Sequence, residues 1–183
     1  MMRVIAGEAR RIQLVTPEGK NTRPTTDRIK ETLFNVLQQE IPGCRFLDLF
    51  SGSGGIGIEA ISRGARHSVF VDNDRAACAC IRENLHKTRF EDRSTLLSME
   101  VMQALRSLDH KETFDVIFMD PPYDKGLELK VLGYLAHSEL LGEDALIIVE
   151  ASLDTELEPL LSCGFTLKKV KEYKTNQHIF LTR

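Results

Sequence analysis

From Arg45 onward the sequence alternates short apolar runs with longer amphipathic segments, and this alternation limits the possible folds more strongly than any other feature. The apolar runs cover residues 46–50, 68–71, 95–97, 114–119 and 145–149, and the helical segments cover about 56–63, 75–88, 101–108, 127–137 and 154–162. Strands that alternate with helices form βαβ units, whose strands are parallel and whose helices cover both faces of the sheet. The pattern therefore predicts an α/β fold with a mainly parallel sheet.

The C-terminal end of the chain breaks this alternation. Two strand-like runs, residues 165–173 and 178–181, are joined only by residues 174–177. A parallel crossover needs about a dozen residues or more, so this connection is too short for one. We expect the sheet to finish with an antiparallel pair of strands.

The first 42 residues do not follow the βαβ pattern. Two short β-like pieces within the first fifteen residues predict a hairpin, and residues 25–27 supply N-cap candidates for a helix that runs to about Glu40. We therefore divide the chain into an N-terminal appendage, residues 1–42, and a main domain, residues 43–183.

Charge is distributed unevenly along the chain. The 183 residues carry a net charge of −3, but residues 1–30 carry +4, which leaves −7 for the rest. A mildly acidic chain is not expected to coat nucleic acid through bulk charge, so phosphate contacts would have to come from the basic front. The alternative interpretation of this basic front is a solvated charged surface that contacts no phosphate. The candidates are Arg10, Arg11, Arg23 and Arg28, together with Arg3 and Lys30.

Membrane insertion, secretion and metal binding have no support in the sequence. No apolar run approaches the roughly 18 residues that span a bilayer, and the N-terminus lacks the apolar region of a signal peptide. The four cysteines form no C-x-x-C pair, and no histidine lies at a zinc-ligand spacing from them. We expect a cytoplasmic protein without a metal, whose cysteines are mostly small buried side chains.

The sequence FLDLFSGSGGIG, residues 46–57, has the pattern of a ligand-binding turn. A buried strand containing Asp48 runs into Gly52, Ser53 and Gly54 at the junction with the next helix. Glycines at such a turn let a ligand approach the backbone and the amides of the helix N-terminus. Both NAD enzymes and S-adenosylmethionine (SAM) enzymes place such a turn at the switch point of the sheet. A tight turn without a ligand is the structural alternative.

Acidic residues at the ends of the first three strands are candidates for cofactor contacts. Asp48 needs a cationic or donor partner if it is buried, and a methionyl ammonium group would be one. Asp72 directly continues its apolar run, at the position where a carboxylate accepts the two hydroxyls of a ribose, and Asp74 is expected to cap the next helix. Glu100 is a weaker candidate beside an adenine ring. Asp72 and Asp74 have a solvated loop residue as their alternative interpretation, and Glu100 has a solvent-facing acid.

The fourth strand leads directly into Asp120-Pro121-Pro122-Tyr123. Two prolines fix the backbone and remove its donors, so the turn offers acceptors only. An exocyclic amino group donates two hydrogens, which the Asp120 carboxylate and the Pro121 carbonyl would accept. Tyr123 would offer a face on which a base stacks. The alternative is a rigid turn whose aromatic residue packs on the edge of the sheet.

These motifs resemble those of class I SAM-dependent methyltransferases. The sequence RPTTDR, residues 23–28, with DLFSGSGGIGIEAISRGA, residues 48–65, resembles the RsmD family, bacterial enzymes that methylate the N2 amino group of a guanine in 16S ribosomal RNA. The resemblance implies a Rossmann-like sheet of seven strands, the last two antiparallel. It also implies SAM as the cofactor and ribosomal RNA, or an assembly intermediate of the small subunit, as the partner.

The resemblance assigns roles to the residues named above. Asp48, Gly52, Ser53 and Gly54 would hold the methionyl part of SAM, Asp72 would hold the ribose, and Glu100 would lie beside the adenine. Asp120, Pro121, Pro122 and Tyr123 would hold the target amine. The front hairpin departs from the G-x-x-R-G-R pattern of the family, since Arg10-Arg11-Ile12 lacks the glycine.

Other functions fit parts of the same pattern. A DNA adenine-N6 methyltransferase uses a similar acid-Pro-Pro-aromatic turn. A protein-glutamine methyltransferase is expected to have Asn in place of Asp120. An NAD enzyme and an RNA-binding module without catalysis are the remaining alternatives.

Overall fold

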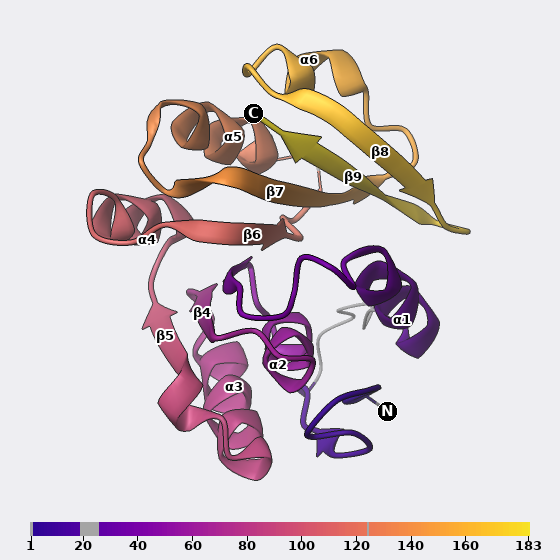
Figure 1. Ribbon diagram of the computed structural model, residues 1–183, viewed down its shortest axis with the longest axis vertical. Helices are drawn as coiled ribbons and strands as arrows, with labels where there is room; N and C mark the ends of the chain where they lie inside the picture. The colour runs from indigo at the N-terminus through magenta and orange to yellow at the C-terminus, as the bar shows by residue number, and fades with distance from the viewer. Residues whose placement is uncertain (1, 19–25, 124) are drawn as a thin grey trace.

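A computed structural model describes residues 2–18, 26–123 and 125–183 (Figure 1). Its main sheet has seven strands in the order β5-β4-β3-β6-β7-β9-β8. The five strands from β5 to β7 are parallel, and β9 is antiparallel to both of its neighbours, β7 and β8. This confirms the expected mostly parallel sheet of seven strands with an antiparallel C-terminal pair.

The strands lie close to the apolar runs that predict them. In the main sheet they are β3 (Arg45–Leu49), β4 (His67–Asp72), β5 (Ser94–Ser98), β6 (Phe114–Met119), β7 (Leu141–Ser152), β8 (Thr166–Glu172) and β9 (Asn176–Thr182). Strand β7 is longer than its apolar run because its first residue pairs with Phe114 and its last pairs with Asn176.

Helices cover both faces of this sheet. They are α1 (Asp27–Val36), α2 (Gly55–Ser62), α3 (Arg75–Thr88), α4 (Val101–Leu108), α5 (Leu127–His137) and α6 (Leu157–Leu161), with a 3₁₀ turn η1 (Glu91–Arg93) before β5. Figure 1 shows α1, α2 and α3 on one side and α4, α5 and α6 on the other. No helix among the described residues is long and apolar enough to cross a membrane.

Alternating residues of the strands supply the two faces of the core. Leu49, Met119 and Val149 pack with residues of α4, α5 and α6. Phe46, Phe118 and Phe180 face the other way and pack with residues of α1 and α2. Because side chains of a strand alternate between the faces, this assignment fixes the direction of every other residue in the parallel strands.

Two helices begin or end differently from their sequence patterns. Thr26 caps α1 by accepting a hydrogen bond from the backbone of Ile29, as expected for one of the N-cap candidates. The helix ends at Val36 rather than at about Glu40, because the chain turns after Leu37 and buries Ile41 in the core. Helix α6 is shorter than its pattern because Glu156, directly before it, is extended.

Residues 2–18, ahead of α1, pack against α2 and α3. Strands β1 (Met2–Arg3) and β2 (Gln13–Leu14) form the expected hairpin. The buried carboxylate of Glu59 in α2 accepts hydrogen bonds from the backbones of Ile5 and Ala6, and Asn84 in α3 bonds to the backbone N–H and C=O of Val15. These bonds fasten the hairpin to the main domain. The boundary near residue 42 stays a prediction.

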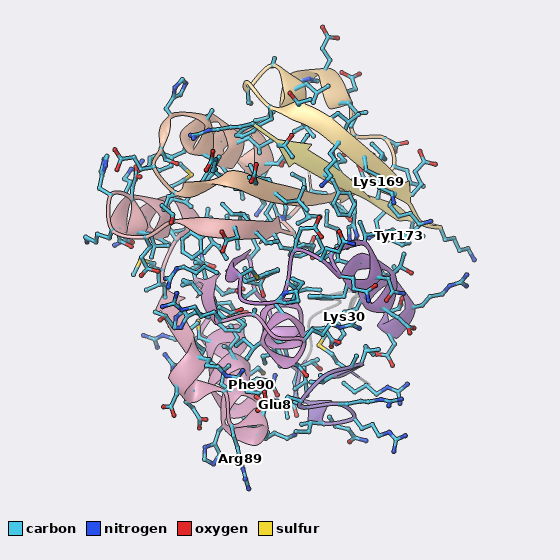
Figure 2. The ribbon with its side chains drawn as sticks, viewed as in Figure 1. Glu8, Lys30, Arg89, Phe90, Lys169 and Tyr173 are labelled. Atoms are coloured by element: carbon cyan, nitrogen blue, oxygen red, sulfur yellow. The ribbon has the colours of Figure 1, made fainter. Side chains whose placement is uncertain are left out.

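Lys30 does not belong to the basic surface that the sequence suggested. Its side chain is buried between α1, the hairpin and α2, where its ammonium lies 3.4 Å from Glu59 and donates to the backbone carbonyl of Arg3 (Figure 2). Burial lowers the pKa of Lys30, while the charge of Glu59 opposes that shift. Arg3 is exposed but pairs with Asp27 at 2.8 Å. Both residues therefore stabilise the appendage.

Candidate active site at the carboxyl edge of the sheet

The turn between β3 and α2 has an unusual backbone. Phe50, Gly52 and Gly54 all have positive φ angles, of 60°, 57° and 80°. A left-handed backbone is strained for an aromatic residue, and such strain is concentrated at ligand-binding turns. The turn lies where β3 meets β4 on one side and β6 on the other, which is the switch point of the sheet.

The glycines of this turn serve different purposes. A Cβ atom at Gly52 would meet nothing within 4 Å, so this part of the backbone is open to a ligand. A Cβ at Gly57 would lie 2.4 Å from the ring of Phe70, so Gly57 is required for close packing of α2 on β4. Gly52 provides the open part of the turn. Gly54 is left-handed but closely packed, since a Cβ there would lie 3.3 Å from Ile81 and Phe70, and Gly57 provides the contact between helix and sheet.

Asp48 is the most deeply buried acid of the edge. Its Oδ2 accepts a hydrogen bond of 3.0 Å from the backbone amide of Gly57, so the donor partner that the sequence requires comes in part from α2. Burial raises the pKa of Asp48 to about 7, the Gly57 hydrogen bond lowers it, and the charge of Asp72 raises it further. A cation at this turn would stabilise the carboxylate.

Asp72 connects β4 to the glycine turn. Its two oxygens accept hydrogen bonds from the backbone amides of Gly52 and Asp74, at 2.8 and 2.9 Å. Asp74 caps α3 by accepting from the backbone of Ala76, as its sequence position predicts. Asp72 therefore lies beside the open backbone at Gly52, where a ribose hydroxyl has room to approach.

Glu100 lies beyond the end of β5, at the N-cap position of α4, rather than in the strand. It is exposed, and its carboxylate accepts a hydrogen bond from the side-chain amide of Asn73. Next to this pair is a hollow of about 450 Å³, lined by Asn73, Arg75, Cys78, Arg82 and Ser98. Its lining residue Asn73 directly follows Asp72 and bonds to Glu100, and the hollow is large enough for part of a nucleoside.

Asp120 follows the last residue of β6 and has an acidic neighbour on β7. Met119 pairs with Val149 across the two strands, so Asp120 and Glu150 stand at the same level and point to the same face. Burial raises the pKa of Asp120 to about 8, and the charges of Glu150 and then Asp48 add to the shift. The structure thus brings two predicted acids, Asp48 and Asp120, into one electrostatically connected group.

Residues of the Asp120–Tyr123 turn border a second cavity. Pro121 is buried, whereas Pro122 and Tyr123 are exposed. The cavity has a volume of about 460 Å³ and includes Pro121, Tyr123 and Glu150 in its lining. A planar heterocycle fits such a volume, and the ring of Tyr123 is accessible from it.

Glu150 is the residue at this edge that the sequence reasoning missed. Asn176 donates to its Oε1 at 2.6 Å, and His178 lies 3.2 Å from its Oε2. The signal was available, because Glu150 directly follows the apolar run 145–149, as Asp72 and Asp120 follow theirs. Its partners are on β9, which only the antiparallel pairing brings next to β7.

The predicted RNA-contact residues lie apart from this edge. Arg10 and Arg11 are exposed in the hairpin, whose neighbouring residue Ala9 bonds to Ser62 at the far end of α2 from the glycine turn. Arg28 is exposed on α1, and Arg23 lies outside the described residues. The part of the chain that the structure describes holds no group of three or more His, Cys, Asp or Glu able to bind a metal ion.

Comparisons with known proteins identify relatives that are similar over nearly the whole chain. The chain is 34% identical over 171 residues to ribosomal RNA small subunit methyltransferase D of Escherichia coli strain K12, covering 93% of this chain and 84% of the relative. It is also 34% identical to the protein of the same name from Haemophilus influenzae, covering 93% and 88% of the two chains. A solved structure of a hypothetical protein from Thermus thermophilus matches with a TM-score of 0.84 and 30% identity, over 98% of each chain.

The family model described as conserved hypothetical protein 95 matches residues 2–182, nearly the whole chain. The match includes the hairpin, the glycine turn and the Asp120–Tyr123 turn. It confirms the resemblance to the RsmD family that these motifs indicated. The chain therefore belongs to the conserved hypothetical protein 95, or RsmD, family.

Proposed function

We propose that this protein transfers a methyl group from SAM to the N2 amino group of a guanine in 16S ribosomal RNA. The observation that carries the proposal is the position of two turns on adjacent strands, the strained glycine turn after β3 and the Asp120–Tyr123 turn after β6. Membership of the RsmD family and the names of the two methyltransferase relatives support the same reaction.

The residues of the glycine turn fit SAM. Asp48 and Asp72 are acceptors close to an open backbone, as a ligand with an ammonium group and two ribose hydroxyls requires. Asp48 would face the ammonium, Gly52, Ser53 and Gly54 would lie along the methionyl part, and Asp72 would take the ribose. The hollow beside Glu100 has room for the adenine.

When bound, SAM supplies a methyl group on a positively charged sulfur, which leaves as a neutral thioether when the methyl group bonds to an amine. Asp120 and the Pro121 carbonyl accept the two hydrogens of the target amine and orient its lone pair. The raised pKa of Asp120, about 8, also makes its carboxylate a suitable acceptor for the proton that the methylated amine releases. Positioning supplies most of the rate enhancement, because the leaving group is already good.

The substrate we propose is the RNA or an assembly intermediate of the small subunit. The described chain has no separate domain for target recognition, so the shape of the RNA must contribute much of the specificity. Arg10, Arg11, Arg23 and Arg28 would contact phosphates at a distance from the reacting amine. Because ribosomal RNA matures in the bacterial cytoplasm, we place the activity there.

The test is methyl transfer from labelled SAM to ribosomal RNA and to small subunits, both from cells that lack the gene. We expect one N2-methylguanine per RNA, mapped to a single nucleotide. Formation of N6-methyladenine, or absence of transfer to either substrate, would overturn the proposal. Calorimetry with SAM and NADH completes the test, because binding of NADH alone contradicts the assignment of the cofactor.

A further inference from the structure

Asp120 and Glu150 form a pair of acceptors at the carboxyl edge of the sheet. Asp120 directly follows β6 and Glu150 lies in β7 at the same level, because Met119 pairs with Val149, and both point to the face opposite Met119 and Val149. Neighbouring strands lie about 4.8 Å apart. The two carboxylates are therefore spaced to meet two neighbouring groups of a single planar ligand.

Glu150 is held in one orientation by residues of β9. Its Oε1 accepts from the side-chain amide of Asn176, and its Oε2 lies 3.2 Å from Nε2 of His178. A carboxylate oxygen only accepts, so Nε2 carries the hydrogen of this bond. Nδ1 of the same ring lies 3.1 Å from the hydroxyl of Tyr173. Tyr173 is the residue directly after β8 (Figure 2). The carboxylate cannot turn away without losing both partners.

His178 is itself fixed by packing. The ring is fully buried and meets the rings of Phe118, Tyr173 and Phe180 edge to face, with centroids 5.9, 4.9 and 6.4 Å away. Burial and the charge of Glu150 raise the pKa of Tyr173 to about 12, so its hydroxyl keeps its hydrogen. The group from Tyr173 through His178 to Glu150 is therefore rigid.

Glu150 still has room to accept a ligand hydrogen. A carboxylate has about four acceptor positions, and Asn176 and His178 occupy two of them. The residue is 7% exposed and borders the cavity of about 460 Å³ beside Pro121 and Tyr123. Because Tyr123 follows Asp120 by three residues, a base that stacks on the Tyr123 ring at the carboxyl edge of the sheet would bring its own edge to Asp120 and Glu150.

Guanine and adenine differ at the edge that would meet this pair. Guanine carries adjacent donors, N1–H and the N2 amino group, whereas adenine carries the N6 amino group beside N1, an acceptor without a hydrogen. Two acceptors side by side match the two donors of guanine. With adenine, one of the two carboxylates would face the lone pair of N1. A buried acceptor without a donor is costly, and a site built on such bonds discriminates strongly.

We propose that Glu150 is a specificity residue that accepts the N1–H of the target base and selects guanine while Asp120 holds the N2 amino group. This inference rests on the proposed function and names the residue that reads the base. It assigns to Asn176 and His178 the role of positioning residues, which hold Glu150 in place.

The substrate for the test is the small-subunit RNA, ligated from fragments with either guanine or 2-aminopurine at the mapped nucleotide. 2-Aminopurine keeps the exocyclic amine but has a lone pair instead of N1–H. We expect kcat/KM for the guanine RNA to exceed that for the 2-aminopurine RNA by about 100-fold or more. Equal reaction of the two RNAs would overturn the proposal without any variant.

The variant E150Q tests the residue itself. Its amide can donate to the lone pair of 2-aminopurine, so the preference for guanine should fall to about tenfold or less. The ratio compares two substrates of the same variant, so partial unfolding does not change it. E150D retains a carboxylate acceptor and should keep the preference for guanine at reduced activity. If E150Q is inactive, E150D still tests the proposal, because loss of the preference in E150D would contradict it. E143Q, the same change at an exposed position of β7, is the matched control.

The outcomes separate this inference from the proposed function. If mapping finds a methylated adenine, both are wrong. If it finds N2-methylguanine and E150Q keeps the full preference for guanine over 2-aminopurine, only the assignment of Glu150 is wrong.

Discussion

The Asp48 carboxylate accepts a hydrogen bond from the backbone amide of Gly57, at 3.0 Å, and is almost completely buried. An amide nitrogen alone does not compensate a buried carboxylate, and the pKa of Asp48 is accordingly raised to about 7. Ionisation of Asp48 near neutral pH therefore lowers the free energy of unfolding. The charge becomes favourable only when a cation binds beside it.

The buried charge of Asp48 should lower the stability of the fold at high pH. An acid with a raised pKa stabilises the fold less as pH increases from its unfolded pKa, near 4, through its folded pKa of about 7. Asp48→Asn keeps an acceptor for Gly57 and removes the charge. Urea unfolding should show the variant about 2 kcal/mol more stable than wild type at pH 8.5, with no such gain at pH 4.5.

The same variant should bind SAM at least tenfold more weakly, because the ammonium loses its carboxylate partner. Calorimetry measures this loss. The control is Asp144→Asn, at an exposed position of β7, which should change neither property. A variant that binds SAM as tightly as wild type contradicts the role of Asp48.

Asp120→Ala should abolish methyl transfer and leave the affinity for SAM within a fewfold. The alanine removes the acceptor for the target amine but none of the contacts of the glycine turn. Single-turnover transfer of labelled methyl groups and calorimetry measure the two properties separately. An active Asp120→Ala enzyme is incompatible with the proposed site.

The pH dependence of the reaction should report Asp120. Only its ionised carboxylate can take up the proton that the methylated amine releases, and its pKa is raised to about 8. We expect kcat/KM for the RNA to rise about tenfold per pH unit below this value and to level off above it. Because the charge of Glu150 contributes to the shift, E150Q should move the rise to lower pH. An unchanged profile in that variant argues against coupling of the two acids.

The ion pair between Lys30 and Glu59 should be important for the stability of the appendage. Glu59 is fully buried and accepts from Lys30, Arg63 and two backbone amides of the hairpin. Glu59→Leu leaves a buried ammonium without its partner and should cost about 3–5 kcal/mol in urea unfolding. Lys30→Met with Glu59→Leu should recover part of this loss. If the double variant loses as much free energy of unfolding as the two single variants lose together, Lys30 and Glu59 do not stabilise the fold as a pair.

Arg10 and Arg11 are predicted to contact phosphates. Their replacement by Glu should weaken RNA binding and reduce the slope of log affinity against log salt by about two. Titrations at several salt concentrations test this, with the double variant Arg106→Glu and Lys111→Glu, at two exposed positions, as the control for the same change in total charge. An unchanged slope would move the RNA contact to another surface.

Most of the fold followed from local patterns. The apolar runs marked β3 to β7, and the short connection between residues 173 and 178 marked the antiparallel pair. These features depend on hydrophobic periodicity and chain length, which are local properties. The ends of α1 and α6 differed because burial of Ile41 and the extended backbone at Glu156 depend on neighbours.

The acids of the candidate site were visible for the same reason, since strand ends are local. Lys30 was placed on the surface because it belongs to a basic stretch, whereas its partner Glu59 lies 29 residues further along the chain. Glu150 also ends an apolar run, but the fixed orientation of its carboxylate depends on Asn176 and His178, which only the pairing of β7 with β9 supplies. Long-range partners of charged residues are what the sequence does not display.

The hairpin at the start of the chain is held by residues made much later. Ile5 depends on Glu59, and Val15 depends on Asn84, 69 residues further along. During synthesis the hairpin residues therefore stay exposed, with their basic side chains, until α2 and α3 have left the ribosome and supply Glu59 and Asn84. The appendage completes its docking only after the strands and helices of the first half of the main domain exist.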